Sequence, residues 1–346
     1  DGGTNQVLAT IKSKDDVPFL SAPLIFVSTL LTHLTGGSAG REGASIQFGG
    51  SIGNWLGKLA HLDEFDHHVM IMCGMSAAFA AVFGTPMAAA VFAMEVVSVG
   101  VMYYAALLPC VIAAIIAAEF ATGMGIDPET FPVHSIPGLT VETGLKMALI
   151  AVGCGILSIL FCILLKTVGQ LYTKYLENPY IRIVVAAGVI ILLTICLNTK
   201  DYMGAGSGLI ARAIEKGEAR PLDFLWKMLL TALTMRAGYR GGEIVPAFSI
   251  GATFGCVAGG ILGFSPELAA AASMVALFCG VTNCPITAML ISFELFGFSG
   301  AAYYLIAISI SYAVSGYYSL YKDQTIVYSK YLSLIHISEP TRQEAI

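Results

Sequence analysis

The chain has 346 residues, of which 56% are hydrophobic and only 12% are charged, and its mean hydropathy is +0.78. Soluble domains of this length carry about a quarter charged residues, so the composition excludes an ordinary soluble fold. The net charge of −5 and the lack of lysine- or arginine-rich runs argue against nucleic acid as a partner.

Long apolar stretches with almost no charge recur along the chain. Each is long enough, or nearly long enough, to cross a hydrocarbon core of about 30 Å as a helix. We therefore predict an all-α polytopic membrane protein, with the lipid bilayer as its surroundings and several passes through the cell membrane. The stretches are 69–82, 102–118, 144–165, 181–197 and 303–318.

The first half contains a glycine-rich segment, 37–50, which carries the acid Glu42 within the sequence Gly-Arg-Glu-Gly. An apolar run that starts at Pro86 and ends at Glu95 follows it. The second half repeats this order, because segment 238–251 contains Gly-Gly-Glu-Ile-Val-Pro and is followed by another apolar run from a proline to a glutamate. The acid, the proline and the final glutamate of the second half are Glu243, Pro285 and Glu294.

The spacing of these features predicts an internal repeat. The second loop acid lies 201 residues after the first, and the proline and the final glutamate each recur after 199 residues. A weaker match joins 3–11 to 206–214. We therefore expect one transmembrane transport domain at 1–332, with halves of about 1–200 and 201–332, as is typical of transporters and channels with inverted repeats. Glycine-rich low complexity is the alternative, but it does not explain the matched proline and glutamate spacings.

Glycine-rich backbone at membrane depth must be shielded from lipid, because each unpaired N–H group there is strongly destabilising. A helix that begins at such a loop offers free N–H groups and the positive end of its dipole, which bind an anion without lysine or arginine. We predict an anion site of this kind at 40–43 and 241–246. The alternative is that these glycines allow close helix packing, which is the role expected for those in 51–57 and 251–255.

An acid inside a hydrophobic membrane segment is a candidate functional residue. The carboxylate of Glu42 would occupy the anion path as a tethered anion and would leave it when protonated, so Glu42 is the predicted gate. The alternative for Glu42 is a local ion pair with Arg41. Glu95 and Glu294 end apolar runs, and we interpret them as helix-end acids that cap a partner helix.

At these loops the chain resembles the CLC family of chloride channels and proton-coupled anion transporters, over nearly all of 1–331. The second family signature, GREGP, stands here as Gly-Arg-Glu-Gly-Ala at 40–44, and the third, GxFxP, as Gly-Glu-Ile-Val-Pro at 242–246. The first, GSGxP, falls loosely on 1–5. The resemblance implies a set of ion-binding residues, namely Gly2, Thr4, Gly43, Glu243, Ile244 and Tyr328.

The resemblance also implies a fold and an assembly. It implies an all-helical protein with two inverted repeats and broken, re-entrant helices, which forms a homodimer with one anion pathway per subunit in the bacterial inner membrane. Helices that precede the first signature in the family are missing before 1–5, so we expect a fragment of a longer protein. Residues 333–346 are polar without periodicity and resemble a translated sequencing adaptor, and we expect a non-native or disordered tail there.

Three departures from the family pattern bear on transport. Proton-coupled bacterial exchangers carry a second glutamate directly after the one matching Glu95, and here Val96 stands there. Ala44 replaces the proline of GREGP, and Gly2 stands where a serine would coordinate chloride. The Gly-Gly-Glu-x-x-Pro form resembles the fluoride–proton antiporter branch, although the methionine typical of that branch's first loop is absent.

We therefore predict a channel or transporter that moves chloride, or another small halide, past Glu42 as a protonatable gate, and we rank chloride above fluoride. The alternative is a proton-coupled fluoride or chloride antiporter, with protons as a second cargo. An intramembrane enzyme is a distant alternative, because neither H-E-x-x-H nor G-x-S-x-G occurs. No cofactor or metal is predicted, since the histidines fall mostly in hydrophilic stretches such as 63–68, read as a solvated loop, and the eight cysteines lie singly in apolar runs.

Overall fold

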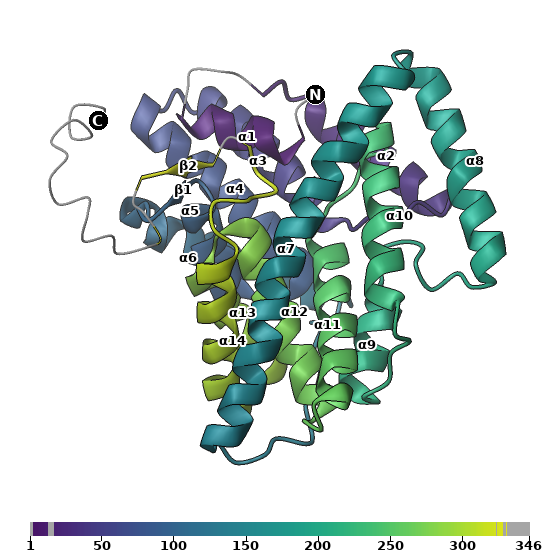
Figure 1. Ribbon diagram of the computed structural model, residues 1–346. Helices are drawn as coiled ribbons and strands as arrows, with labels where there is room; N and C mark the ends of the chain where they lie inside the picture. Colours follow the sequence, from purple (N-terminus) through teal and green to yellow (C-terminus); the bar gives the residue numbers. More distant parts are fainter. Residues whose placement is uncertain (1–2, 13–16, 323, 328–329, 331–346) are drawn as a thin grey trace, which may run out of the picture.

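The computed structural model describes residues 3–12, 17–322, 324–327 and 330, and this part of the chain is almost entirely helical (Figure 1). Two very short strands and two short 3-10 helices complete it. The elements are α1 (Thr4–Lys12), α2 (Ser21–Leu34), α3 (Glu42–Leu59), α4 (Glu64–Phe83), α5 (Pro86–Glu95), β1 (Ser98–Val99), η1 (Tyr104–Ala106), α6 (Leu107–Gly123), α7 (Val141–Tyr175), α8 (Pro179–Leu197), α9 (Ser207–Glu215), α10 (Asp223–Ala237), α11 (Ile244–Ile261), α12 (Pro266–Thr282), α13 (Pro285–Phe296), η2 (Phe298–Gly300), α14 (Ala301–Val314) and β2 (Thr325–Ile326).

Five helical segments in the described residues are long and apolar enough to cross a membrane. Three of them, α4, α7 and α8, contain predicted stretches, and α6 with η1 overlaps the stretch 102–118, which begins two residues before η1. The fifth is α11, which was not among the predicted stretches although it is more apolar than α4. The stretch at 303–318 falls largely in α14, which is apolar but shorter than a full crossing. The polytopic membrane architecture is thus confirmed.

Helix α12 forms the centre of the molecule. Every residue from 268 to 282 is buried, and α12 packs against α11, α14 and α7. The outer helices instead expose large apolar side chains, such as Phe120 on α6 and Ile195 on α8, each 70% exposed. In Figure 1 α8 lies at the edge of the molecule beside α10. Apolar side chains that face outward are stable against lipid or against another apolar protein surface, as expected for a membrane protein.

Each half packs its broken helix against the next helix through glycines. In the first half, a Cβ atom on Gly53 of α3 would lie 2.5 Å from the carbonyl oxygen of Met70 on α4. In the second half, a Cβ atom on Gly255 of α11 would lie 2.3 Å from the carbonyl oxygen of Ala269 on α12. Only glycine permits backbones this close, so the packing role predicted for the glycines in 51–57 and 251–255 is confirmed.

Glu95 of the first half caps the N-terminus of α13 in the second half, and Glu294 of the second half caps the N-terminus of α5 in the first. The Glu95 carboxylate accepts the backbone N–H groups of Ile286 and Thr287, at 3.0 and 2.8 Å, and the Thr287 hydroxyl at 2.6 Å. In return, the Glu294 carboxylate accepts the first two N–H groups after the proline of α5, each at 2.9 Å. The predicted capping role is therefore observed, and the exchange shows that the two halves are related by an approximate two-fold axis.

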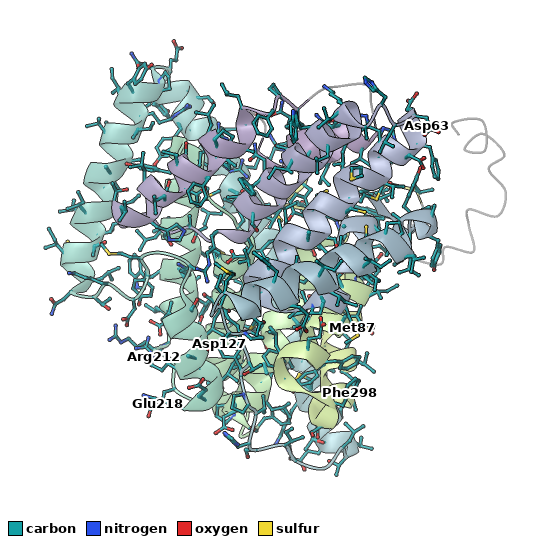
Figure 2. The ribbon with its side chains drawn as sticks, turned by 180° about the vertical axis from the view of Figure 1, so that it is seen from behind. Asp63, Met87, Asp127, Arg212, Glu218 and Phe298 are labelled. Atoms are coloured by element: carbon teal, nitrogen blue, oxygen red, sulfur yellow. The ribbon has the colours of Figure 1, made fainter. Side chains whose placement is uncertain are left out.

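The stretch 63–68 was wrongly predicted to be a loop. Asp63 is the N-cap of α4, and its carboxylate accepts the N–H group of Asp66 at 2.8 Å. Nε2 of His67 lies 2.9 Å from Oδ1 of Asn54 on α3. An aspartate N-cap followed by acids is a helix-start pattern that outweighs the polarity of the segment. Figure 2 shows Asp63 at one end of the molecule and Glu218 near the other.

Candidate functional site

The two glycine-rich loops meet through an antiparallel pair of hydrogen bonds. Gly40 donates its N–H to the carbonyl oxygen of Gly242, and Gly242 donates to that of Gly40, both at 2.7 Å. The 201-residue repeat makes Gly40 equivalent to Gly241, and Arg41 equivalent to Gly242. A two-fold axis that exchanges the halves therefore carries Gly40 onto Gly241 and Gly242 onto Arg41. The resulting pair, Arg41 and Gly241, lies directly next to Gly40 and Gly242 in the same antiparallel arrangement. The halves meet at equivalent points, directly before α3 and α11.

Both positions of this contact leave little room for a side chain. A Cβ atom on Gly242 would lie 2.5 Å from the backbone nitrogen of Gly43, and one on Gly40 would displace the Glu42 carboxylate, whose Oε2 would lie 2.3 Å from it. The N-terminal turns of α3 and α11 are thus brought together with almost no side chain between them. The first N–H groups of a helix have no partner within it, and the helix dipole is positive there, so the junction favours an anion.

The carboxylate of Glu42 lies inside this junction. Glu42 is the first residue of α3 and only 2% exposed, and its Oε2 accepts the backbone N–H of Arg41 at 2.9 Å. Its Oε1 lies 3.9 Å from Nε of Arg41, whose side chain is 60% exposed. The ion pair with Arg41 is therefore present but long, and the carboxylate itself is folded back over Gly40.

The structure brings together the predicted ion-binding residues that it describes. The Thr4 hydroxyl donates to the carbonyl oxygen of Gly43 at 3.1 Å, which places the start of α1 against α3. Glu243 is the N-cap of α11, and Ile244, its first residue, is 1% exposed. Gly2 and Tyr328 lie outside the described residues.

The segment directly before Tyr328 is attached to both halves. β2 pairs in parallel with β1, and the N–H of Val327 donates to the carbonyl oxygen of Val99 at 3.1 Å. The amide of Gln324 donates to the carbonyl oxygens of Val96 and Thr282, at 3.1 and 2.8 Å. Val96 itself is fully buried. The C-terminal segment is thus anchored at the ends of α5 and α12.

The linker between α6 and α7 brings a further acid to the site, which the sequence interpretation missed. Oε1 of Glu129 lies 3.7 Å from Nη2 of Arg41. The linker is fixed nearby, because the N–H of Phe131 donates to the carbonyl oxygen of Leu295 at 3.0 Å. Burial raises the pKa of the Glu129 carboxyl, and the positive charge of Arg41 offsets part of this rise.

A buried lysine near the first glycine loop was also missed. Lys227 of α10 is fully buried, and its Nζ donates to Oγ of Ser38 at 3.0 Å and to the carbonyl oxygens of Tyr202 and Gly204, at 3.1 and 2.7 Å. A single lysine within the apolar run 224–235 was the signal available in the sequence.

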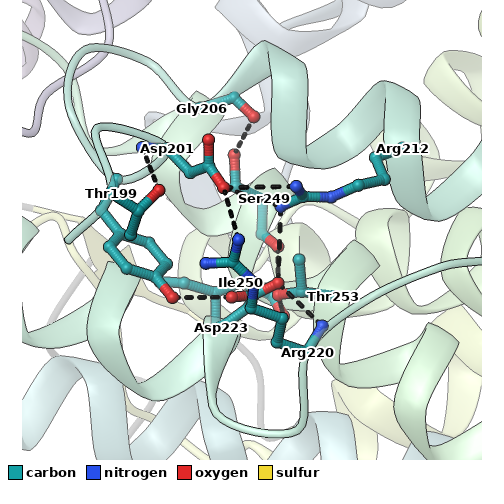
Figure 3. Close-up of polar contacts among 10 residues, drawn as sticks. Thr199, Asp201, Gly206, Arg212, Arg220, Asp223, Ser249, Ile250 and Thr253 are labelled. Carbon is teal, nitrogen blue, oxygen red and sulfur yellow. Dashed lines mark hydrogen bonds and ion pairs between the residues drawn. The ribbon is translucent and has the colours of Figure 1, made fainter. Parts of the chain in front are cut away.

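A polar network holds the loop that faces Lys227 (Figure 3). Oδ2 of Asp201 accepts both terminal nitrogens of Arg212, each at 3.2 Å. The buried Asp223 accepts the Tyr202 hydroxyl at 2.7 Å and the N–H of Arg220 at 2.9 Å. The α8–α9 loop is therefore fixed to the last turn of α9 and to the start of α10.

Metal and thiol chemistry find little support in the described residues. No group of three histidine, cysteine, aspartate or glutamate side chains there is placed to hold a metal ion. All eight cysteines are free thiols. Six are buried, as predicted for small apolar residues, but Cys73 is half-buried and Cys196 is exposed on the outer face of α8.

The fold, the repeated broken helices and the glycine junction define an anion-transport protein. A sequence profile described as "Voltage gated chloride channel" matches residues 1–316. The chain therefore belongs to the voltage-gated chloride channel (CLC) family, as its motifs predicted, and it has the all-helical inverted-repeat fold of that family.

Known relatives include both channels and exchangers. The chain is 33% identical to a chloride/fluoride channel protein of Pseudomonas syringae pv. tomato, over 96% of this chain and 75% of that protein. It is 28% identical to the H(+)/Cl(-) exchange transporter ClcA of Vibrio cholerae, over 74% of this chain but only 58% of that protein. Among solved structures, a CLC-type fluoride/proton antiporter superposes with a TM-score of 0.90 at 34% identity, covering 94% of this chain and 82% of that one.

Proposed function

We propose that this chain moves small halide ions through the junction of α3 and α11, with Glu42 as the gate. The observation that carries the proposal is the mutual pairing of Gly40 and Gly242, which places the two helix N-termini against the buried Glu42 carboxylate. Backbone N–H groups attract an anion without the strong binding of a full positive charge, so the ion enters and leaves easily. No catalytic reaction is assigned to the chain.

The gate works by exchange of one anion for another. When ionised, the Glu42 carboxylate fills the junction and excludes a halide. When protonated, it loses its attraction to the helix N-termini, and a halide takes its place. Ion binding is assigned to Thr4, Gly43, Glu243 and Ile244, together with Gly2 and Tyr328 beyond the described residues. The Thr4 hydroxyl donates to the carbonyl oxygen of Gly43, a contact that also holds the start of α1 against α3.

Two observations bear on the cargo and the coupling. Val96 stands where proton-coupled exchangers carry a second acid, and it is buried among apolar residues, which supports a passive or weakly coupled pathway. The relatives at 33% and 34% identity are a chloride/fluoride channel protein and a fluoride/proton antiporter. These likenesses support fluoride ahead of chloride, which reverses the ranking from the sequence alone. A proton-coupled fluoride or chloride antiporter is the second candidate.

The assembly and location are part of the same proposal. We infer a homodimer in the bacterial inner membrane, with the transport domain at 1–332, its halves meeting near 200, and a non-native tail at 333–346. The outward apolar faces of α6 and α8 support contact with lipid or with a second copy.

Efflux from proteoliposomes tests the proposal. Vesicles loaded with fluoride or chloride are diluted into halide-free buffer, and halide release is followed with ion-selective electrodes while proton movement is followed in parallel. We expect halide release with little proton uptake, faster for fluoride. Vesicles that release neither halide would overturn the proposed function. Uphill proton movement driven by a halide gradient would establish the antiporter instead.

A further inference from the structure

Lys227 is a buried lysine that has no carboxylate beside it. Its side chain is fully buried, and its three hydrogen bonds go to one hydroxyl and two carbonyl oxygens, all of them neutral. Within the residues that the structure describes, no acid lies within ion-pair distance of it. Burial disfavours the charged form of an amine, so such a lysine keeps its proton only where an anion is near enough to stabilise the charge.

The geometry places this charge behind the first glycine loop. Ser38, which accepts from Lys227, precedes Gly40 by two residues. The same serine bonds through its N–H to Thr234 and through its hydroxyl to Thr231, at 3.1 and 3.0 Å, so α10 holds the loop from behind. On the opposite side of Lys227, Gly206 leaves no room for a side chain, since a Cβ atom there would lie 2.9 Å from Cε of the lysine.

The nearby charged groups identify the counter-charge. Arg41 and Glu42 follow Ser38 by three and four residues, and His33 of α2 lies against Gly204, which accepts from Lys227. Both acids lie within ion-pair distance of Arg41, Glu129 at 3.7 Å and Glu42 at 3.9 Å, but Glu42 is 2% exposed and lies against Gly40, whereas the Glu129 side chain is 31% exposed. Glu42 is therefore the acid whose charge balances the lysine.

We propose that Lys227 is the fixed positive charge of the anion pathway, balanced by the Glu42 carboxylate when the gate is closed and by the transported halide when the gate is open. This inference rests on the proposed function. The three N–H groups of the ammonium are already donated to the protein. Lys227 therefore acts through its electric field without contacting the ion, and removal of its charge weakens the binding of every halide equally.

Halide binding to the purified full chain, measured by calorimetry, tests the charge. Lys227→Gln removes the charge but keeps donors, and we expect roughly tenfold weaker binding of both fluoride and chloride, with their affinity ratio unchanged. Lys227→Arg keeps the charge and is expected to bind within about threefold of the parent. Lys174→Gln, at the exposed end of α7, is the matched control for loss of a positive charge and should bind as the parent does.

A charge-compensated pair keeps the test valid if Lys227→Gln alone does not fold. Glu42→Gln leaves the lysine unbalanced, so it should bind halide more tightly than the parent. Glu42→Gln with Lys227→Gln removes both charges and should lose this gain, by roughly tenfold. Equal binding by Glu42→Gln and the double variant would overturn the role of Lys227, as would a changed fluoride-to-chloride ratio in Lys227→Gln. A parent that transports no halide in vesicles would instead overturn the proposed function.

Discussion

At the scale of single residues, the site concentrates several charges within one glycine loop. Glu42 is 2% exposed, Lys227 is fully buried, and Arg41 lies between the carboxylates of Glu42 and Glu129, at 3.9 and 3.7 Å. Glu42 and Lys227 are shielded from water, whereas the Arg41 side chain is 60% exposed, so the buried charges act at a lower effective dielectric constant than Arg41 does. We propose that the charge state of this loop sets the access of the halide.

Glu42→Gln should abolish the part of the pH dependence of halide flux that the gate causes, and should leave passive flux intact. The amide has the shape of the protonated acid and never fills the junction as an anion. Halide efflux from vesicles, measured between pH 4 and 8 for the variant and the parent, checks this expectation. Persistence of the parental pH response in the variant would remove Glu42 from the gate and leave it as a buried partner of Arg41.

Glu129→Gln should raise halide flux at neutral pH and reduce its further increase in acid. Ionised Glu129 competes with the halide for the positive charge of Arg41. Since burial raises the pKa of Glu129, it becomes protonated at a higher pH than an exposed glutamate does, and flux in the parent should rise as the pH falls through that raised value.

The same efflux measurements in Glu129→Gln and in a matched control decide this point. Glu142 is a suitable control, because it pairs with Lys146 at the exposed start of α7, far from Arg41 in the sequence. A Glu142→Gln variant should behave as the parent. If both variants changed flux equally, the effect would be one of general surface charge.

At the scale of helices, the exchange of caps between the halves fixes their relative position. Glu95 and Glu294 each accept N–H groups from the first turn of the other half's helix. A carboxylate at a helix N-terminus gains from both the hydrogen bonds and the dipole. The two caps therefore hold α5 and α13 against each other, with α12 behind α13.

Glu95→Gln should destabilise the fold more than Glu294→Gln does. Glu95 is 8% exposed and accepts three hydrogen bonds, whereas Glu294 is half-buried and accepts two. We expect a loss of about 2–3 kcal/mol for Glu95→Gln and about 1 kcal/mol for Glu294→Gln. Unfolding of both variants in detergent measures the difference. Equal losses would mean that burial and the third hydrogen bond contribute little.

At the scale of the whole molecule, the proposed anion site is built from backbone of both halves, at the contact of Gly40 with Gly242. Helix N-termini converge on it, and the outer helices present apolar side chains to the lipid. A cation would meet the positive ends of two helices and the charge of Lys227. The arrangement therefore favours anions at every point described.

The reconstituted protein should pass halides and exclude sodium and potassium. Reversal potentials in a planar bilayer, measured with a potassium chloride gradient, are expected to follow the chloride equilibrium potential. A potential that follows potassium would contradict the anion pathway. Empty bilayers and bilayers with the Glu42→Gln variant are the controls, and the variant should keep the same selectivity because the backbone that lines the junction is unchanged.

The amino-acid sequence by itself determined the membrane class, the helical fold, the duplication and the position of the gate candidate. These features depend on local composition and on regular spacings, such as the matched intervals that relate Glu42 to Glu243 and Glu95 to Glu294. Apolar length and glycine content act locally, so they can be read along the chain. The membrane span of α11 was missed although the segment is apolar, and the helical start at 63–68 was missed because its acids and histidines make the segment polar.

Only the tertiary structure decided which residues meet. The Gly40–Gly242 pairing and the contact of Glu129 with Arg41 join positions far apart in the chain. So does the bond from Lys227 to Ser38. Such contacts arise because the two-fold relation of the halves brings separate loops to one point. The spacing of residues along the chain does not give the distance between those loops in space. A lone lysine in an apolar helix is visible in the sequence. The acid proposed to balance its charge can be identified only once the structure shows that the lysine lies behind the first glycine loop.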